Sequence, residues 1–457
     1  MHTIVAVSTP YGSGGIAVIR VSGDDAVSLV NKVWKGADLT KAVSHTAHLG
    51  NIVSSDGNTL DEAVATIFLG PKSYTGEDTV ELSIHGSKWL QNEIVTLLIE
   101  NGASAAEPGE FTRRAFINGR LDLAQAEGVA DLIAASSRAS HKLAMMQLSG
   151  SFSSKLNELR ERLIELSSLL ELELDFSEED VEFADRTHLR NISDETLALM
   201  QRLASTYKSG RAFKEGIPVA IAGRPNAGKS TLLNAILDDE KAIVTDTPGT
   251  TRDVIEDTCE IGGVLFRFYD TAGLRETDDE VERIGIERAH EAIAKAMIVL
   301  WMIDTSSDRD DILHQLEEIK EKISADSDSK HIIVYNKADI SNNAIKDKNK
   351  SEQYHTLRLS AKTGEGLEDL KRHLIALSKK DFDPDNEIIV TNARHHAALL
   401  SGIESLSRAR RAMEEGLSAD FVAQDIRETI HHLSTLTGQI TTDNLLGNIF
   451  ENFCIGK

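Results

Sequence analysis

The sequence predicts a multidomain chain in which an α/β domain interrupts an all-α domain and an α+β domain comes first. Three observations predict this fold class. Short apolar runs alternate with helical stretches over the first 119 residues. Strand patterns are missing between residue 121 and about residue 208 and again after Pro384, where apolar residues recur at helical spacing. From Ile217 onward, β-rich runs and helical stretches alternate, which is typical of a doubly wound parallel sheet.

Length, composition and charge limit the possible classes of protein. A chain of 457 residues exceeds what one hydrophobic core usually supports, which predicts two to four domains. No apolar run approaches the roughly 20 residues that a bilayer span needs. The first residues lack a basic leader and are broken by Pro10 and Gly12, so we expect a cytoplasmic protein. The net charge of -24 means that a nucleic-acid partner requires a local basic patch or a second protein.

The two cysteines, Cys259 and Cys454, lie far apart in the sequence. They build neither a disulfide framework nor a cysteine-rich zinc site. A reducing compartment fits this usage.

The N-terminal domain is expected over residues 1–119. Strands are predicted at Ile16–Val21, Ala63–Leu69 and Val80–Ile84, and a helix at Ser87–Asn101. This mixture predicts a small α+β domain.

The helical domain is expected from two separate segments, residues 120–215 and 379–457. The first segment carries leucines along one predicted helix face, namely Leu156, Leu159, Leu163, Leu166 and Leu170. In the second segment, helices are predicted at Ala393–Glu415, Ala419–Leu436 and Asp443–Phe453. The two flanks predict one helical bundle that residues 216–378 interrupt.

The inserted domain is expected to place its motifs at the ends of its strands. Strands are predicted at Pro218–Ala222, Val264–Tyr269, Met297–Ile303, His331–Tyr335 and Tyr354–Leu359. Gly223–Ser230 follows the first of them and fits the phosphate-loop pattern. Its glycines let backbone N–H groups surround phosphates, Lys229 reaches the β and γ oxygens, and Ser230 supplies a hydroxyl to Mg²⁺.

Three further motifs follow in the expected order, which argues against a chance glycine-rich turn. Asp270–Gly273 ends a strand where a carboxylate can hold the metal's water shell and an N–H can sense the γ-phosphate. In Asn336–Asp339 the carboxylate of Asp339 accepts two guanine N–H groups that adenine does not offer, which selects GTP over ATP. Ser360–Lys362 is similar to the last base-contacting loop of translation-factor GTPases.

The hydrolytic group is less obvious from the residues alone. Leu274 stands where Ras-like GTPases carry a glutamine that orients water, so another group must do this. Arg252 and Arg275 lie in or beside the predicted switch segments, with Asp253 next to Arg252. A catalytic role and a structural role remain open for both arginines.

Several motifs together resemble the tRNA-modification GTPases of the MnmE (TrmE) family. They include Gly249–Asp253, Asp270–Arg275, Asp279–Arg288 and the terminal Cys454–Lys457. The N-terminal part adds Gly14–Ile16 with Arg20, Tyr74–Asp78, Pro108–Thr112 and Leu121–Glu127. The resemblance covers essentially the whole chain and implies an α+β N-terminal folate-binding-type domain, a helical bundle domain and an inserted Ras-like P-loop G domain.

The resemblance also implies roles for individual residues. K⁺ between the β- and γ-phosphates is bound by Asn226 and the loop containing Thr245, Thr247 and Thr250, and Thr251 joins Ser230 at Mg²⁺. Glu282 orients the hydrolytic water through a second water, although without the family it reads as a solvated helix charge. Arg20, Glu81, Arg120 and Lys457 are implied for a folate. The candidate GTP-binding residues are Asn226, Ala227, Gly228, Lys229, Ser230, Thr231, Thr245, Thr250, Thr251, Asp270, Thr271, Ala272, Gly273, Asn336, Lys337, Asp339, Ser360 and Ala361.

The function implied by the resemblance is GTP hydrolysis in the modification of tRNA. The resemblance implies that this chain forms a homodimer and acts with a flavin-dependent partner, MnmG. Together they attach an aminomethyl or carboxymethylaminomethyl group to C5 of the wobble uridine, with 5-formyl- or methylene-tetrahydrofolate as the folate. Candidate tRNA contacts are Arg113 and Arg114 and the cluster Arg408, Arg410 and Arg411, each with a solvated helix face as the alternative.

Two other readings remain open at the level of sequence. A ribosome-assembly GTPase of the same superfamily would share the G-domain motifs, but we would not expect it to carry the N-terminal signatures or the Cys454–Lys457 end. A GTP-sensing scaffold with negligible hydrolysis would not need Lys229, Ser230, Thr251 and Asp270 all intact.

Overall fold

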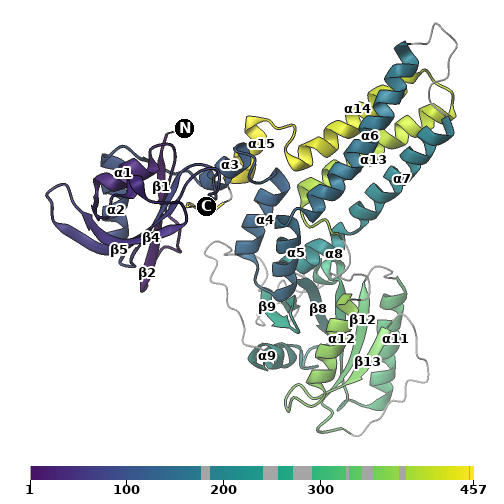
Figure 1. Cartoon of the computed structure of the whole chain (residues 1–457). Helices are drawn as coiled ribbons and strands as arrows, with labels where there is room; N and C mark the ends of the chain where they lie inside the picture. The colour runs from purple at the N-terminus through teal and green to yellow at the C-terminus, as the bar shows by residue number, and fades with distance from the viewer. Residues whose placement is uncertain are drawn as a thin grey trace. The chain divides into compact units, whose positions relative to one another are not determined.

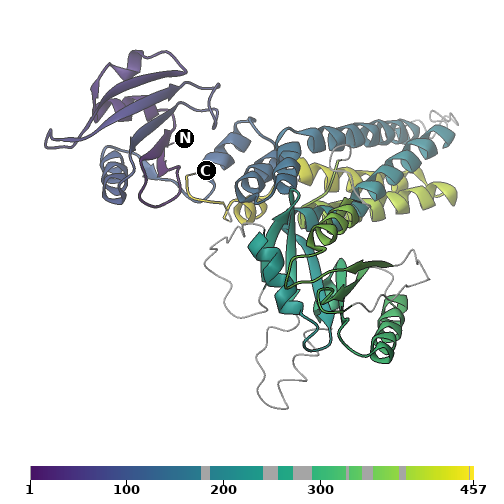
Figure 2. The same ribbon diagram turned by 90° about the horizontal axis from the view of Figure 1, so that it is seen from below.

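The computed structural model describes residues 2–175, 186–239, 256–270, 291–325, 329–341, 354–379, 388–451 and 453–456. The chain divides into two compact units (Figure 1; Figure 2). The first contains Met1–Ala130, Gln147–Ser193 and Ser405–Lys457, and the second contains Asp131–Met146 and Asp194–Glu404. The chain therefore passes several times from one unit to the other.

The first unit contains a seven-stranded sheet in the order β3-β4-β5-β6-β2-β1-β7. Only the pairing of β1 with β7 is parallel among these strands. Alternate residues such as Ala17, Ile19 and Val21 are buried, and they share a core with the helices α1 and α2. The elements are β1 (Ile4–Val7), β2 (Ile16–Ser22), α1 (Ala26–Lys32), β3 (Trp34–Gly36), the 3-10 helix η1 (Leu39–Lys41), β4 (Thr46–Val53), β5 (Thr59–Phe68), β6 (Thr79–His85), α2 (Lys88–Glu100) and β7 (Ser104–Ala105).

The predicted N-terminal elements are confirmed as β2, β5, β6 and α2. Helix α2 begins after Ser87 because the Ser87 hydroxyl accepts a hydrogen bond from the Leu90 N–H at 3.2 Å. The α+β character of this part of the chain follows from the sheet and these helices.

The helices on either side of residues 216–378 range from 8 residues in α3 to 25 in α6. The five leucines predicted on one face of α6 are at most 3% exposed, and α6 packs along α14 (Figure 1). The helices are α3 (Glu110–Ile117), α4 (Leu123–Ala134), α5 (Arg138–Leu148), α6 (Ser151–Asp175), α7 (Arg186–Ser205), α8 (Tyr207–Glu215), α13 (Ala393–Glu414), α14 (Ala419–Thr437) and α15 (Asp443–Phe450).

Helix α15 ends at Phe450, three residues before the predicted end at Phe453. The Phe453 N–H instead donates to the Phe450 carbonyl at 3.0 Å, which turns the chain. Ile455 then forms an antiparallel bridge with Pro108. The C-terminal residues thus continue onto the N-terminal part of the first unit.

The second unit contains a six-stranded sheet in the order β13-β12-β11-β8-β10-β9. The pairings are parallel except that of β9 with β10, so the predicted parallel sheet has one antiparallel edge strand. Helices α9 and α12 contribute to the core on one face and α11 to the core on the other, which confirms the doubly wound class. The elements are β8 (Ile217–Gly223), α9 (Lys229–Asp239), β9 (Glu256–Ile261), β10 (Val264–Asp270), β11 (Ile298–Asp304), α11 (Arg309–Ala325), β12 (Lys330–Asn336), β13 (Tyr354–Arg358) and α12 (Leu367–Lys379).

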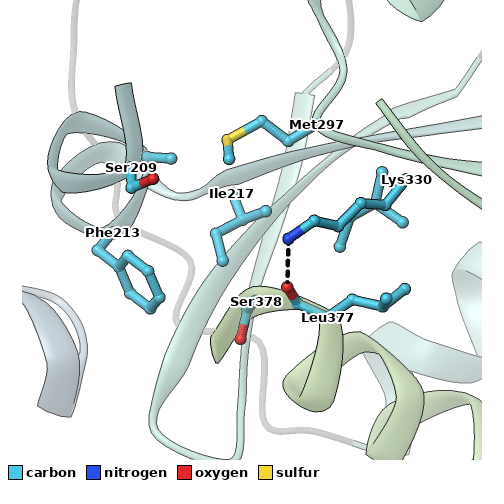
Figure 3. A pocket seen from close by; sticks show the side chains of 9 residues that line it. Ser209, Phe213, Ile217, Met297, Lys330, Leu377 and Ser378 are labelled. Carbon is cyan, nitrogen blue, oxygen red and sulfur yellow. Dashed lines mark hydrogen bonds between the residues drawn. The ribbon is translucent and has the colours of Figure 1, made fainter. Parts of the chain in front are cut away.

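The core of this unit extends beyond residues 216–378. Ala212 and Phe213 of α8, and Ala139 and Leu143 of α5, belong to the same buried cluster as the strands. Figure 3 shows Phe213 beside a cavity of about 10 Å³ at the start of the sheet, enough for about one water molecule. There the Lys330 Nζ donates to the carbonyl of Leu377 at 2.9 Å and holds the end of α12 (Figure 3). The predicted domain limits remain a prediction, and the compact core includes segments on both sides of them.

Candidate nucleotide and folate sites

The phosphate loop connects the end of β8 to the start of α9, at the carboxyl edge of the sheet. A Cβ on Gly223 would lie 2.6 Å from the carbonyl oxygen of Met302, and one on Gly228 would lie 2.2 Å from Asn336 Nδ2. Both glycines also have positive φ angles, so side chains at these positions are excluded. The pattern that predicted the loop therefore has a steric cause.

Lys229 is turned back into this loop. It is only 8% exposed, and its Nζ donates to the carbonyl oxygens of Gly223 at 2.9 Å and Arg224 at 3.0 Å. These contacts fix the ammonium group above the loop, next to the N-terminus of α9. The loop thus combines a fixed cation with a helix N-terminus, an arrangement that suits phosphate groups.

Asn336 joins the phosphate loop to the loop predicted to contact guanine. Its Nδ2 donates to the carbonyl of Ala227 at 2.8 Å, and its Oδ1 accepts the N–H of Ala361 at 2.9 Å. Asn336 is 3% exposed, so neither bond competes with bulk water. Asn336 and Ala227 are 109 positions apart in sequence. Their hydrogen bond therefore holds the phosphate loop and the Asn336–Asp339 motif in one rigid arrangement.

The predicted base-contacting residues lie beside this connection. The Ser360 hydroxyl donates to Asp339 Oδ1 at 2.7 Å, and this hydrogen bond is the main reason why the pKa of the Asp339 carboxyl is lowered. Asp339 is therefore an ionised acceptor at neutral pH, as recognition of two guanine N–H groups requires. Lys337 adopts a positive φ of 65°.

Asp304 is a residue of this site that sequence reasoning missed. The Nζ of Lys337 donates to Asp304 Oδ2 at 2.5 Å. Burial on its own raises the pKa of the Asp304 carboxyl, but hydrogen bonds from Lys337 and Ser306 lower it overall. Asp304 is the last residue of β11 and follows six buried residues of that strand. A carboxylate at the end of a buried strand was the sequence signal that could have identified it.

Asp270 is the last residue of β10, paired in parallel with Ile221 of β8. Its backbone therefore lies at the same edge of the sheet as the phosphate loop. The other candidates lie outside the described residues, namely Thr245, Thr247, Thr250, Thr251, Arg252, Asp253, Thr271, Ala272, Gly273, Arg275, Glu282 and Lys457.

The described residues supply one predicted oxygen ligand for Mg²⁺ and one for K⁺. The hydroxyl of Ser230, in the first turn of α9, is a hard oxygen donor of the type that Mg²⁺ prefers. Asn226, exposed in the phosphate loop with a φ of 62°, offers an amide carbonyl suited to K⁺. The remaining predicted ligands of both ions lie outside the described residues.

Arg20 and Glu81 form the centre of the candidate folate site. They are opposite each other on β2 and β6, and Arg20 Nε and its terminal nitrogen donate to Glu81 Oε1 at 3.0 and 2.8 Å. The guanidinium carbon lies 5.0 Å from the ring centroid of Tyr74 and 5.6 Å from that of Phe111. Burial raises the pKa of the Tyr74 hydroxyl, so it stays protonated. Phe111 is 0% exposed and supports the guanidinium from within the core. The cation of Arg20, the carboxylate of Glu81 and the partly buried ring of Tyr74 fit an aromatic, anionic ligand such as a folate.

Three further observations concern this region. Arg120 is exposed and its Cγ would lie 3.3 Å from a Cβ on Gly76. The Ser8 hydroxyl donates to the carbonyl of Gly456 at 3.0 Å, which fixes the chain next to Lys457. Cys454 is an exposed free thiol.

The structure removes Arg114 from the candidate tRNA contacts. Its guanidinium is 3% exposed and pairs with Glu77 at 3.0 Å and Glu110 at 2.8 Å. Arg408 is likewise paired, with Asp425 and Glu428. Burial therefore also contradicts the solvated helix face expected as the alternative for Arg114, whereas Arg408, with a side chain that is 41% exposed, stays a candidate tRNA contact.

The described part of the chain lacks two features. None of its helices is long and apolar enough to cross a membrane. Among the same residues, no group of three or more His, Cys, Asp or Glu side chains is arranged to hold a metal ion.

Comparison with known proteins places the chain among GTPases. A family model described as the GTP-binding protein TrmE N-terminus matches residues 3–120, and one described as the MnmE helical domain matches residues 123–454. The tRNA modification GTPase MnmE of Flavobacterium johnsoniae is 48% identical, over 100% of this chain and 99% of the relative. That of Parabacteroides distasonis is 46% identical, over 100% of both chains.

A solved structure, the G domain of the FeoB iron transporter of T. maritima, is 26% identical and covers 36% of this chain and 99% of its own, with a TM-score of 0.27. The family assignment does not depend on that structure. The N-terminal match argues against the rival ribosome-assembly class, for which this segment was not expected. The loops around Lys229 and Asn336, together with the two family models and the full-length relatives, show that the chain belongs to the MnmE family of tRNA-modification GTPases.

Proposed function

We propose that the chain hydrolyses GTP to drive modification of C5 of the wobble uridine in tRNA. In this proposal a flavin-dependent partner, MnmG, acts with it to attach an aminomethyl or carboxymethylaminomethyl group. The observation that carries the GTPase part is the pair of hydrogen bonds by which Asn336 joins the phosphate loop to the guanine loop. The full-length similarity to MnmE relatives supports the tRNA part.

Each described residue of the nucleotide site has a role in this proposal. Lys229 stabilises the charge of the β- and γ-phosphates, and Ser230 binds Mg²⁺ together with Thr251. Asp339 accepts guanine N1–H and N2–H, and Lys337, positioned by Asp304, lies along the base. Mg²⁺ supplies charge neutralisation at the phosphates when it is bound.

Asn226, Thr245, Thr247 and Thr250 would hold K⁺, and the bound ion would supply the positive charge that an arginine finger supplies in other GTPases. Glu282 orients the attacking water, since Leu274 has no hydrogen-bonding group. Arg252, Asp253 and Arg275 are proposed to support the switch segments. The G domains of two copies are proposed to pair during turnover.

The N-terminal region is proposed to bind tetrahydrofolate as its 5-formyl or methylene form and to form the homodimer. Arg20, Arg120 and Lys457 offer cations for the glutamate tail, and Glu81 offers a carboxylate for the pterin ring. The proposed domains are residues 1–119, 120–215 with 379–457, and 216–378. A dimer of this chain with two MnmG subunits forms the proposed heterotetramer.

GTP turnover in K⁺ and Na⁺ buffers of equal ionic strength tests the catalytic proposal. We expect strong stimulation by K⁺ in the unmodified protein and its loss in Asn226→Ala. Asn157→Ala is the matched control, because Asn157 lies on α6 and accepts a bond from Gln439. Equal rates in the two salts would refute the role of K⁺.

A further inference from the structure

The β9–β10 hairpin of the second unit turns through two glycines. Gly262 and Gly263 have φ angles of 58° and 85°, between the paired residues Ile261 and Val264. Positive φ at both central residues produces the tight hairpin turn whose twist matches that of the strands. This explains the need for glycine but leaves open what the turn contacts.

The turn is wedged between two helices of the same unit. A Cβ on Gly262 would lie 2.5 Å from Ile375 Cδ1 on α12, and one on Gly263 would lie 3.3 Å from Arg138 Cβ on α5. The carbonyl of Gly263 accepts the N–H of Ala139 at 2.9 Å. The turn therefore contacts α5 through backbone atoms, with almost no room between them.

The hydrogen bond from the Ala139 N–H to the Gly263 carbonyl gives a partner to one of the first N–H groups of α5. The first N–H groups of a helix have no partner within the helix. Ser137 and Ser140 satisfy two of them reciprocally, since each backbone N–H donates to the other's hydroxyl at 3.0 and 3.1 Å. The N–H of Ala139 depends instead on the hairpin. Ala139 and Leu143 also share the buried core with Cys259 and Ile261 of β9.

The other end of the hairpin lies at the nucleotide edge of the sheet. Strand β10 ends at Asp270, whose partner Ile221 precedes the phosphate loop. Strand β9 begins at Glu256, directly after the segment that contains Thr251 and Arg252 in sequence. At about 3.3 Å per residue the strands span roughly 20 Å. One stiff element therefore leads from both predicted switch segments to the start of α5.

We propose that the Gly262–Gly263 turn transmits the nucleotide state of the GTPase site to the first turn of α5. This inference rests on the proposed GTPase cycle. A shift of the hairpin acts directly on α5, because the carbonyl of Gly263 accepts the Ala139 N–H at 2.9 Å and the space beside Gly263 is too small for a methyl group at an ordinary contact distance. The shift lengthens the bond from Ala139 or moves α5 with the turn. Closely packed contacts of this kind change between discrete arrangements.

Amide hydrogen exchange of the full-length protein tests the proposal. We expect amides 138–141 to exchange at rates that differ at least fivefold between the GDP state and a state with a non-hydrolysable GTP analogue. The amides of α11, on the opposite face of the sheet, serve as an internal reference and should change less than twofold. Equal protection of α5 in the two states would overturn the proposal.

Two glycine variants separate transmission from stability. Gly263→Ala inserts a methyl group against Arg138 and should abolish the nucleotide dependence at residues 138–141. Gly57→Ala is the matched control, because Gly57 also turns a hairpin with positive φ, of 78°, but a Cβ there meets nothing within 4 Å. A nucleotide dependence that persists in Gly263→Ala would contradict the proposal.

Arg138→Ala provides a second test if Gly263→Ala folds poorly, since it removes the Arg138 atoms Cδ and Cγ, which lie 3.5 and 3.9 Å from the position of a Cβ on Gly263, without adding any atom. A reduced nucleotide dependence at 138–141 is expected, and an unchanged one would contradict the contact's role. Failure of GTP binding itself would appear as unchanged exchange in the phosphate loop of the unmodified protein. That result would refute the proposed function, and it is distinguishable from failure of transmission alone.

Discussion

The change Asn336→Ala should weaken the GTP-bound state more than truncation of any other single side chain in the two base-contacting motifs, Asn336–Asp339 and Ser360–Lys362. It removes both hydrogen bonds that Asn336 makes, and leaves the carbonyl of Ala227 and the N–H of Ala361 without these partners. A buried polar group left unpaired costs about 1–3 kcal/mol. The two groups together therefore cost about 2–6 kcal/mol, because Asn336 is 3% exposed and water does not replace it.

This cost divides between two measurable quantities. If the loops of the free protein relax into water, the loss appears as weaker GTP affinity, and otherwise as lower stability of the unit. Fluorescent-nucleotide titration gives the first quantity, and amide exchange of β11 and β12 gives the second. We expect the two losses to sum to at least about 2 kcal/mol.

The control for this experiment is Thr429→Val, which removes a buried hydrogen bond to Ser405, 2.9 Å long, in the first unit. It should leave GTP affinity unchanged. A summed loss below about 1 kcal/mol for Asn336→Ala would refute the reasoning, because it would mean that the two bonds are replaced without cost.

Three further predictions follow from the same contacts. Asp304→Ala should weaken GTP binding about 5- to 30-fold with kcat unchanged, since it removes a charge-assisted hydrogen bond to Lys337. Asp304→Asn should restore most of the lost affinity. Equal GTP affinities of Asp304→Ala and the unmodified protein in a titration would contradict this prediction. The pKa of Asp339 is lowered, so its contribution to guanine binding is present above the ordinary value of 3.8 and lost as pH falls through the lowered pKa. Ser360→Ala should move that loss of affinity to higher pH, and superimposable titrations at each pH would argue against it. Arg114→Met leaves the carboxylates of Glu77 and Glu110, whose side chains are 8% and 15% exposed, without their cation. It should destabilise the first unit by about 3–5 kcal/mol in denaturant unfolding, without changing GTP turnover; an unchanged midpoint would show that the two ion pairs contribute nothing.

The parts of the fold that sequence predicted well are those with a local cause. The glycines of the phosphate loop are required locally by their positive φ angles, as at Gly228 with a φ of 96°. The leucine face of α6 follows from helical periodicity. The central strands β8, β11 and β12 follow from short apolar runs that are buried along nearly their whole length.

The missed features depend on partners distant in sequence. Strand β9 reads Glu-Asp-Thr-Cys-Glu-Ile, which is too polar to stand out, and it is defined by pairing with β10. Arg114 looks like part of a basic patch until the fold brings Glu77, 37 residues away, against it. Lys337 belongs to a recognisable motif, whereas its partner Asp304 does not.

The limits of the domains could not be predicted from local sequence patterns either. Helix α8 lies before the predicted domain limit at residue 216, yet Phe213 is 2% exposed in the core of the second unit. Hydrophobic residues next to a limit carry no mark of which core they join, and tertiary packing decides it.

The most direct test of the central claim is nucleoside mass spectrometry of tRNA from a bacterial strain that lacks its own member of this family. The strain would be complemented with this chain or with its Lys229→Ala variant, expressed to equal levels. The account predicts that the modified wobble uridine returns with the unmodified chain and stays absent with Lys229→Ala, because the variant loses the cation above the phosphate loop. Full restoration by Lys229→Ala would show that the GTPase site does not drive the tRNA chemistry, and would contradict the account.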